Sequence, residues 1–232
     1  LVDQIAFPPT REIRNTLGAV VSAHGLRQVK IAESEKAIHV RYFLNGKREE
    51  PFPGETHCFV PSPEVDDYAR TPEMNAHGVS QAAVEALDDD QADLIMVNFC
   101  NVDVVGHIED HDAVLAAVEA VDRHVGQVAA AAQARGVTAV VTADHGTVEK
   151  WYYPDGTIDT GHTDSEVPFV LVTPRGGRQD EDGTLSVRDG GTLIDVAPTV
   201  LDLMGIEQPG TMTGASLIEG GGHQPQRVAL FI

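Results

Sequence analysis

The stretch AVVTADHG at 139–146 constrains the fold of this chain most. An apolar, β-branched run of the kind found in buried strands ends there in a carboxylate, an imidazole and a glycine. At the carboxyl end of a parallel strand, such side chains face the ligand crevice of an α/β sheet, and Gly146 permits a tight turn. An isolated pair such as Asp144 and His145 more often caps a helix or turn, so other stretches must decide.

Two further stretches favour a metal site. The apolar run LIMVNF at 94–99 is followed by Asp103 and His107, whose spacing places both side chains on one face of a helical turn. His162 lies shortly before the apolar run VPFVLV at 167–172. Carboxylate and neutral imidazole suit Mn²⁺, Zn²⁺ or Fe²⁺. Two aspartates and three histidines at predicted strand borders therefore suffice for one three-ligand site and part of a second.

The rest of the chain predicts one α/β domain spanning 1–232. At 42% hydrophobic residues, the chain can bury a single good core. Apolar spacing predicts helices over 11–24, 75–87, 112–134 and 192–204, and strands over 28–32, 38–44 and 93–99. Segment 52–70 reads as an irregular surface connection, 176–183 as a polar loop and 220–226 as flexible. We expect a three-layer α/β/α sandwich with a mostly parallel central sheet.

Composition limits the classes of partner that the chain can bind. A net charge of −20 opposes non-specific binding to nucleic acid or to an anionic membrane surface. There are only two cysteines, and no apolar run approaches the roughly 20 residues of a membrane span. We expect a soluble, cytoplasmic monomer. The first residues contain neither a signal peptide nor an initiator methionine, which predicts that the chain begins in mid-protein.

Three motifs, in this order, resemble cofactor-independent phosphoglycerate mutase, a family of the alkaline phosphatase superfamily. They are NVDVVGH at 101–107, TADHG at 142–146 and GHT at 161–163. Supporting stretches are IAESEKAIHV at 31–40, PFPGE at 51–55, PSP at 61–63, RDGG at 188–191, DVAPTVLDLMG at 195–205 and MTG at 212–214. The resemblance runs from about residue 7 to residue 218, nearly the whole chain.

The resemblance implies an alkaline-phosphatase-like fold and phosphoryl transfer between the 2- and 3-hydroxyls of glycerate in glycolysis. In this family the transfer passes through a phosphoserine flanked by two Mn²⁺ ions. Asp103, His107 and His162 map to one metal ion, and Asp144 and His145 map to the other. The remaining ligands of the second ion in the family are an aspartate and the nucleophilic serine, both near the N-terminus of a full-length enzyme.

Lys36 takes its expected role from the same resemblance. Taken alone, Lys36 reads as a solvated lysine flanked by Glu33 and Glu35. The family maps it onto an active-site lysine that helps to neutralise the phosphoryl group during transfer. His39, in the predicted strand that follows, is expected to pack in the core and is left out of the site.

The chain also departs from the family pattern. The family's N-terminal aspartate strand, its serine motif and its inserted substrate domain have no counterpart here. Ser62 lies in a proline-bounded loop that matches a different motif, so the nucleophilic serine is absent from this chain. We therefore expect an incomplete chain that is inactive alone. Alternatives are a phosphopentomutase, another metal-dependent phosphohydrolase of the superfamily, or a non-catalytic metal-binding remnant. The Glu35-Lys36 pair and the PFPGE stretch disfavour phosphopentomutase.

Overall fold

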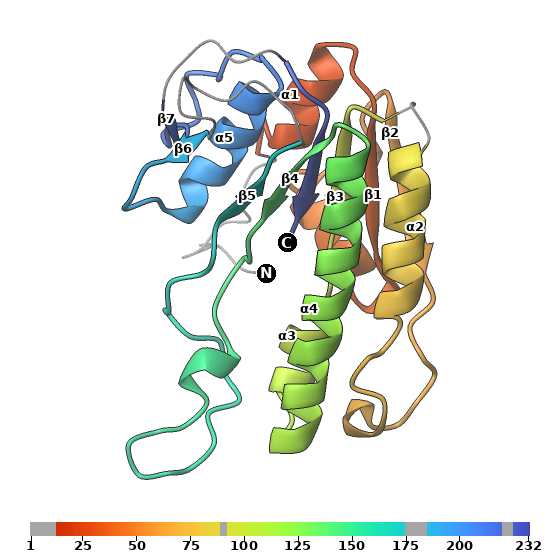
Figure 1. Cartoon of the computed structure of the whole chain (residues 1–232), viewed down its shortest axis with the longest axis vertical. Coiled ribbons are helices and arrows are strands. Elements are labelled where there is room, and N and C mark those ends of the chain that lie inside the picture. Colours follow the sequence, from red (N-terminus) through yellow and green to blue (C-terminus); the bar gives the residue numbers. More distant parts are fainter. Residues whose placement is uncertain (1–12, 89–91, 175–184, 220–224) are drawn as a thin grey trace, which may run out of the picture.

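A computed structural model describes residues 13–88, 92–174, 185–219 and 225–232. Its centre is a six-stranded sheet in the order β2-β1-β3-β8-β4-β5, parallel except for the antiparallel pair β4 and β5 (Figure 1). The strands are β1 (Gln28–Glu33), β2 (Glu55–Val60), β3 (Leu94–Val97), β4 (Thr138–Val141), β5 (Val170–Val172) and β8 (Val228–Phe231). A separate antiparallel pair joins β6 (Ser186–Val187) to β7 (Ile218–Glu219).

Helices cover both faces of this sheet. They are α1 (Leu17–Ala23), α2 (Ala76–Asp88), α3 (Asn101–Gly106), α4 (His111–Ala134) and α5 (Val196–Leu203). One core cluster packs α2 and α4 against the face that includes Ile95 and Phe231. A second packs α1 and α5 against the face that includes Met96 and Leu230. Successive strand residues thus point into opposite layers, and the predicted three-layer sandwich with a mostly parallel sheet is confirmed.

The central strand β8 is the main feature that the sequence did not predict. It follows every other strand in the chain, yet it lies between β3 and β4 and is parallel to both. Leu230, for example, pairs with Met96 on one side and Val140 on the other. All four of its residues are buried. β8 therefore joins two groups of strands that would otherwise share no ladder.

The predicted strand over 38–44 is wrong. Residues His39–Phe43 form a π-helical turn, in which the Leu44 amide donates to the His39 carbonyl at 3.0 Å. β1 and β2 run parallel, so the connection between them must return along the sheet, and helical turns make that return. His39 is exposed rather than packed in the core, so that expectation is also wrong.

Two other boundaries differ from prediction. Segment 52–70 contains edge strand β2, whose half-exposed side chains and flanking prolines hide the usual apolar pattern. The first helix begins at Leu17, because the Thr16 hydroxyl caps it by accepting from the Ala19 amide, and Ile13 is exposed instead of buried. The start of that predicted helix, the polar loop 176–183 and most of 220–226 lie outside the described residues.

The remaining predicted helices are confirmed within a few residues. α2 and α4 match the spacings over 75–87 and 112–134. The closing segment divides into a 3₁₀ turn, Leu193–Asp195, and α5, and the turn begins at a capping box between Thr192 and Asp195. Among the described helices, none is both long enough and apolar enough to cross a bilayer.

A charged network is buried between β1, β2 and the turn after the π-helical segment. Lys30 and Glu55 lie 3.3 Å apart with side chains 1% and 0% exposed. The Asn45 amide donates to Glu55 at 2.8 Å and its oxygen accepts from Lys30. Burial alone would raise the pKa of Glu55, but hydrogen bonds from His57 and Asn45 and the charge of Lys30 lower it. For Lys30, burial prevails and lowers the pKa.

We expect Glu55→Gln to destabilise the chain by about 3 kcal/mol at pH 7, since it leaves the Lys30 charge buried without a counter-charge. The pKa of Glu55 is lower when folded, so its stabilising effect is present above its ordinary value of 4.5 and is lost as the pH falls through the folded value. Urea unfolding at pH 7 and at a series of lower pH values below 4.5 measures both effects. Exposed Glu50→Gln is the control; an equally small change for the two variants would contradict a role for the network.

Candidate metal centre

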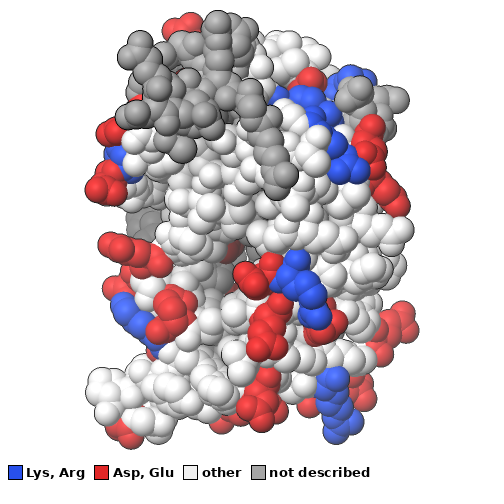
Figure 2. All heavy atoms as spheres, viewed as in Figure 1, with Lys and Arg blue, Asp and Glu red and all other residues white. Residues whose placement is uncertain are grey.

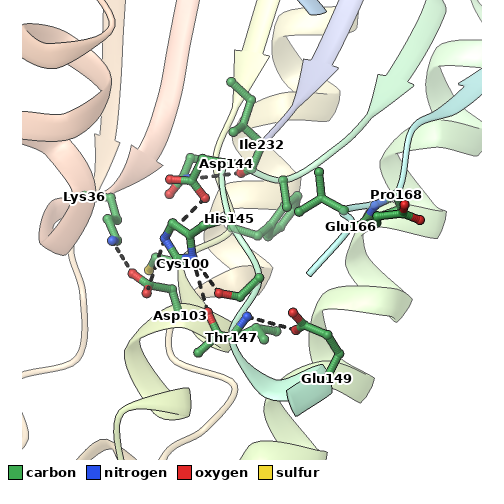
Figure 3. Close-up of a pocket in the computed structure, with 16 residues that line it drawn as sticks. Lys36, Cys100, Asp103, Asp144, His145, Thr147, Glu149, Glu166, Pro168 and Ile232 are labelled. Atoms are coloured by element: carbon green, nitrogen blue, oxygen red, sulfur yellow. Dashed lines mark hydrogen bonds and ion pairs between the residues drawn. The ribbon is translucent and has the colours of Figure 1, made fainter. Parts of the chain in front are cut away.

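The carboxyl ends of β1, β3, β4 and β8 open into one pocket of about 270 Å³ (Figure 3). Its charged and imidazole lining consists of Lys36 after β1, Asp103 in α3, Asp144 and His145 after β4, and Glu149 and Glu166 farther on. Ile232, which directly follows β8, contributes an apolar side chain to the lining of this pocket. The predicted crevice at the strand ends is therefore present in the structure.

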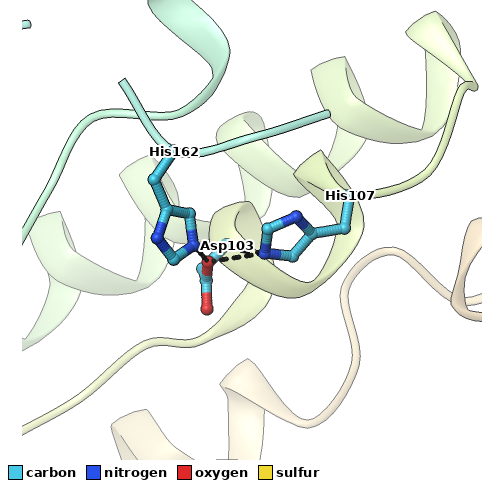
Figure 4. Close-up of side chains that lie close together, drawn as sticks. All are labelled: Asp103, His107 and His162. Atoms are coloured by element: carbon cyan, nitrogen blue, oxygen red, sulfur yellow. Dashed lines mark hydrogen bonds and ion pairs between the residues drawn. The ribbon is translucent and has the colours of Figure 1, made fainter. Parts of the chain in front are cut away.

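Three predicted ligands converge beside this pocket. Asp103 lies in α3, and His107 is the residue directly after this helix. His162 comes from a loop far along the chain (Figure 4). Asp103 Oδ1 lies 2.9 Å from His162 Nε2 and 3.2 Å from His107 Nε2. The two imidazole nitrogens are themselves 3.2 Å apart. All three ligand atoms lie within 4.8 Å of one another, close enough to share a cation.

The hydrogen bond of the His107 imidazole selects a tautomer suited to metal binding. His107 Nδ1 lies 2.6 Å from the Thr160 carbonyl, which can only accept, so Nδ1 carries the proton. The His107 ring therefore turns Nε2 toward Asp103, and metal-binding histidines are oriented in this way. His145 Nδ1 lies 3.2 Å from the Gly146 carbonyl and 3.3 Å from the Thr147 hydroxyl, which hold that ring in place.

The second predicted site is only half assembled. His145 Nε2 lies 3.5 Å from Asp144 Oδ1 and 3.7 Å from Asp103 Oδ1. The Asp144 side chain is 63% exposed, whereas that of Asp103 is 17% exposed. His145 also stacks on His162, with ring centroids 3.6 Å apart. The two predicted sites thus adjoin, and Asp103 lies between them.

Lys36 lies at the same edge and pairs with Asp103. It belongs to the 3₁₀ turn Ser34–Lys36 directly after β1, and both partners are mostly buried. Burial of Asp103 opposes its ionisation, but the hydrogen bond and charge of Lys36, together with His162, lower its pKa. The carboxylate is therefore charged at neutral pH and available to a cation.

The donor set fits a divalent transition-metal ion. One carboxylate oxygen and two imidazole nitrogens point to a common position, and their mutual distances need no rearrangement of the backbone. His107 Nε2 and His162 Nε2 lie 3.2 Å apart, a separation that two ligands of one ion can adopt. Imidazole and carboxylate together suit Mn²⁺, Fe²⁺, Co²⁺ or Zn²⁺.

Sequence reasoning missed two acidic residues at this pocket, Glu149 and Glu166. Glu149 follows the Asp144-His145-Gly146 motif closely in the sequence, and this nearness could have indicated that it lies at the pocket. Glu166 follows His162 in the same way. His39 is also closer to the site than expected, because it lines a small neighbouring cavity together with Asp144. Only the fold could reveal that position.

Comparisons with known proteins identify the family. The model of a metalloenzyme superfamily matches residues 4–208. The 2,3-bisphosphoglycerate-independent phosphoglycerate mutase of Halobacterium salinarum is 47% identical over 93% of this chain and 41% of that protein. The mutase of that name from Moorella thermoacetica is 46% identical over 94% of the chain and 40% of its own length. The chain thus spans about two fifths of these relatives.

A solved structure gives the same result. A crystal structure titled as Leishmania mexicana phosphoglycerate mutase at low cobalt concentration superposes with a TM-score of 0.77 and 30% identity. The superposition covers 88% of this chain and 39% of the Leishmania mexicana chain. The resemblance to cofactor-independent phosphoglycerate mutases seen in the motifs is therefore confirmed. With its strand-end cluster of aspartates and histidines, this chain belongs to the metalloenzyme superfamily, and phosphoglycerate mutases are among its relatives.

Proposed function

We propose that this chain is the metal-binding part of a phosphoglycerate mutase that moves a phosphoryl group between the 2- and 3-hydroxyls of glycerate. The observation that carries the proposal is the convergence of Asp103, His107 and His162 in a chain whose relatives are named as such mutases. We also propose Mn²⁺ as the ion, a cytoplasmic setting, a monomer and catalysis in glycolysis. Because the chain spans only part of its relatives, its own activity needs a direct test.

Electrostatics explain why such a site is needed. The chain carries a net charge of −20, and the acidic side chains of the face in Figure 2 lie mainly along its left edge and in its lower half, with basic ones beside some of them. A phosphorylated acid is repelled by this surface unless positive charge is concentrated locally. A bound divalent ion supplies that charge and stabilises the phosphoryl oxygens during transfer. Lys36 adds an ammonium group at the same edge.

The protein side chains have separate tasks. Asp103 lies between the two candidate sites and orients Lys36 through their ion pair. The Thr160 carbonyl holds the His107 ring with Nε2 toward Asp103. Covalent transfer through a phosphoserine requires a serine, and none of the 232 residues matches the family's serine motif. We therefore infer that these residues bind and polarise, while the nucleophile belongs to a longer protein.

Metal analysis tests the candidate ligands. The unaltered chain should retain one ion tightly at Asp103, His107 and His162, and the half-assembled second position should be weaker. Replacing His107 or His162 by Ala should weaken binding by at least about tenfold, since even outer hydrogen-bond partners of metal ligands contribute that much. Exposed His111→Ala, which lies outside the cluster, is the control. Unchanged metal content in both site variants would exclude this assignment.

A coupled mutase assay tests the activity. The 232-residue chain with Mn²⁺ should give only background interconversion of 2- and 3-phosphoglycerate, because it lacks a covalent carrier. A chimaera that replaces the matching region of the Halobacterium salinarum mutase with this chain should be active, and His107→Ala in the chimaera should abolish that activity. Robust turnover by the isolated chain, or a folded but inactive chimaera, would count against the proposal.

A further inference from the structure

The loops that carry His145 and His162 are tied together by the backbone. The Thr163 amide donates to the Gly146 carbonyl at 2.9 Å, and the two residues form an isolated antiparallel bridge. Each member of the bridge directly follows a candidate ligand in the chain. The relative position of the two imidazoles therefore depends on whatever holds this bridge closed.

The Glu149 carboxylate spans the same two loops. One oxygen accepts from the Thr147 amide at 2.9 Å, and the other accepts from the Thr163 hydroxyl at 2.6 Å (Figure 3 shows the first bond). Burial acts to raise the pKa of Glu149, but these hydrogen bonds, together with its own backbone amide and the Ser165 side chain, lower it to about 2. We call Glu149, Thr147, Thr163 and Gly146 the clasp.

The clasp leaves no room at Gly146. A methyl group added there would lie 1.9 Å from Glu149 Oε1 and 2.4 Å from Thr163 Oγ1. Both oxygens would have to move, so glycine is required for this arrangement. Because Gly146 has no side chain, the Glu149 carboxylate can lie directly against the backbone that follows Asp144 and His145.

Two observations connect the clasp to the site. The His145 and His162 rings stack with centroids 3.6 Å apart and planes 18° from parallel, directly beside the clasp in the chain. Glu149 lines the same pocket as Asp103 and His145 but is not part of the set of close ligand atoms found among the described residues. Its geometry is that of a group that holds ligands rather than of a ligand.

We propose that Glu149 is a positioning residue that sets the spacing of His145 and His162 and so couples the two candidate metal positions. The inference rests on the proposed metal role of these histidines. Outer hydrogen-bond partners of metal ligands typically change metal affinity 10- to 100-fold. Glu149 also differs from most such partners, because it contacts the backbones or hydroxyls of two loops rather than one imidazole.

The test compares three single variants of the 232-residue chain. Glu149→Gln removes the charge and the acceptor for one of the two donors. Thr163→Val keeps the carboxylate and removes the hydroxyl, which donates to Glu149 and accepts from the Ser165 amide at 3.4 Å. Glu166→Gln is the matched control, because it removes the same charge from the rim of the same pocket and Glu166 is exposed. Titration with Co²⁺, followed by visible absorption, gives the affinity, and thermal unfolding without metal gives the stability.

We expect both clasp variants to bind Co²⁺ about tenfold more weakly than the unaltered chain, with Glu166→Gln close to unaltered. Adding Glu149→Gln to His162→Ala should weaken binding at the position formed with Asp103 and His107 no further, since the clasp acts on that position through the His162 ring. In the metal-free chain, the proton contacts between the His145 and His162 rings seen by NMR should be lost in Glu149→Gln and kept in Glu166→Gln.

The outcomes separate the two proposals. If the unaltered chain binds no Co²⁺, the proposed function fails, and the ring contacts of the metal-free chain still decide the clasp. Retained ring contacts together with unchanged affinity in Glu149→Gln and Thr163→Val would overturn the positioning role. Equal weakening by Glu166→Gln would also overturn it, because charge rather than geometry would then be responsible. If Glu149→Gln does not fold, Thr163→Val carries the same comparison.

Discussion

Replacing Leu230 by proline is expected to abolish folding of the chain. Leu230 is 1% exposed in the middle of the central strand and pairs with both β3 and β4. Proline removes a ladder donor and fits poorly in a central strand, at a cost of about 3 kcal/mol or more. Loss of the buried leucine side chain adds about 2–5 kcal/mol. The sum is comparable to the whole stability of a typical domain, about 5–15 kcal/mol.

Circular dichroism and urea unfolding measure this effect. Leu230→Met is the matched control, because it keeps the backbone donor and most of the volume and should cost less than about 1.5 kcal/mol. A cooperatively folded Leu230→Pro chain would mean that β3 and β4 do not need the strand between them.

The second large effect is expected at Lys36. In the active chimaera, Lys36→Met should lower the rate of phosphoryl transfer by about a thousandfold, as the loss of a single positioned cation does in other phosphoryl-transfer enzymes. Metal affinity should stay the same or rise, because the ammonium competes with a metal ion for Asp103. Lys36 would thus assist the reaction at some expense of ion binding.

Rate and affinity measured on the same protein distinguish this role from a structural one. Exposed Lys150→Met, which removes a surface ion pair with Asp164, should alter neither. A Lys36→Met chimaera that loses metal and activity together would show that Lys36 supports the site rather than the transfer. Unchanged activity would exclude both roles.

The sequence predicted the convergence of Asp103, His107 and His162 better than the sheet around them. Asp103 and His107 are four residues apart on one helix, so their closeness follows from local geometry alone. His162 joins them from a distant loop, and only the ordered family motifs placed it there before the structure did. Glu149 lies close to the Asp144-His145-Gly146 motif in the sequence, but its contact with Thr163 forms only on folding, so the link between the two loops was not predicted.

The errors in the fold have a common physical origin. Residues 38–44 alternate like a strand, but the parallel arrangement of β1 and β2 requires a returning connection at that point. Propensity is local, whereas strand order is set by packing of the whole sheet. For the same reason, the apolar pattern VALF at 228–231 did not indicate that this segment forms a central strand of the sheet.

That central strand has a consequence for how the molecule forms during synthesis. β3 and β4 leave the ribosome well before β8, the strand that lies between them in the sheet. Leu94 and Thr138 both pair with Val228, which is synthesised much later. Until it arrives, each presents an open edge with buried-type side chains, which is the form of intermediate most prone to self-association. Pairing partners so distant in the chain also slow folding. We therefore expect the yield of soluble chain to depend on expression temperature and on chaperones more than its native stability would suggest.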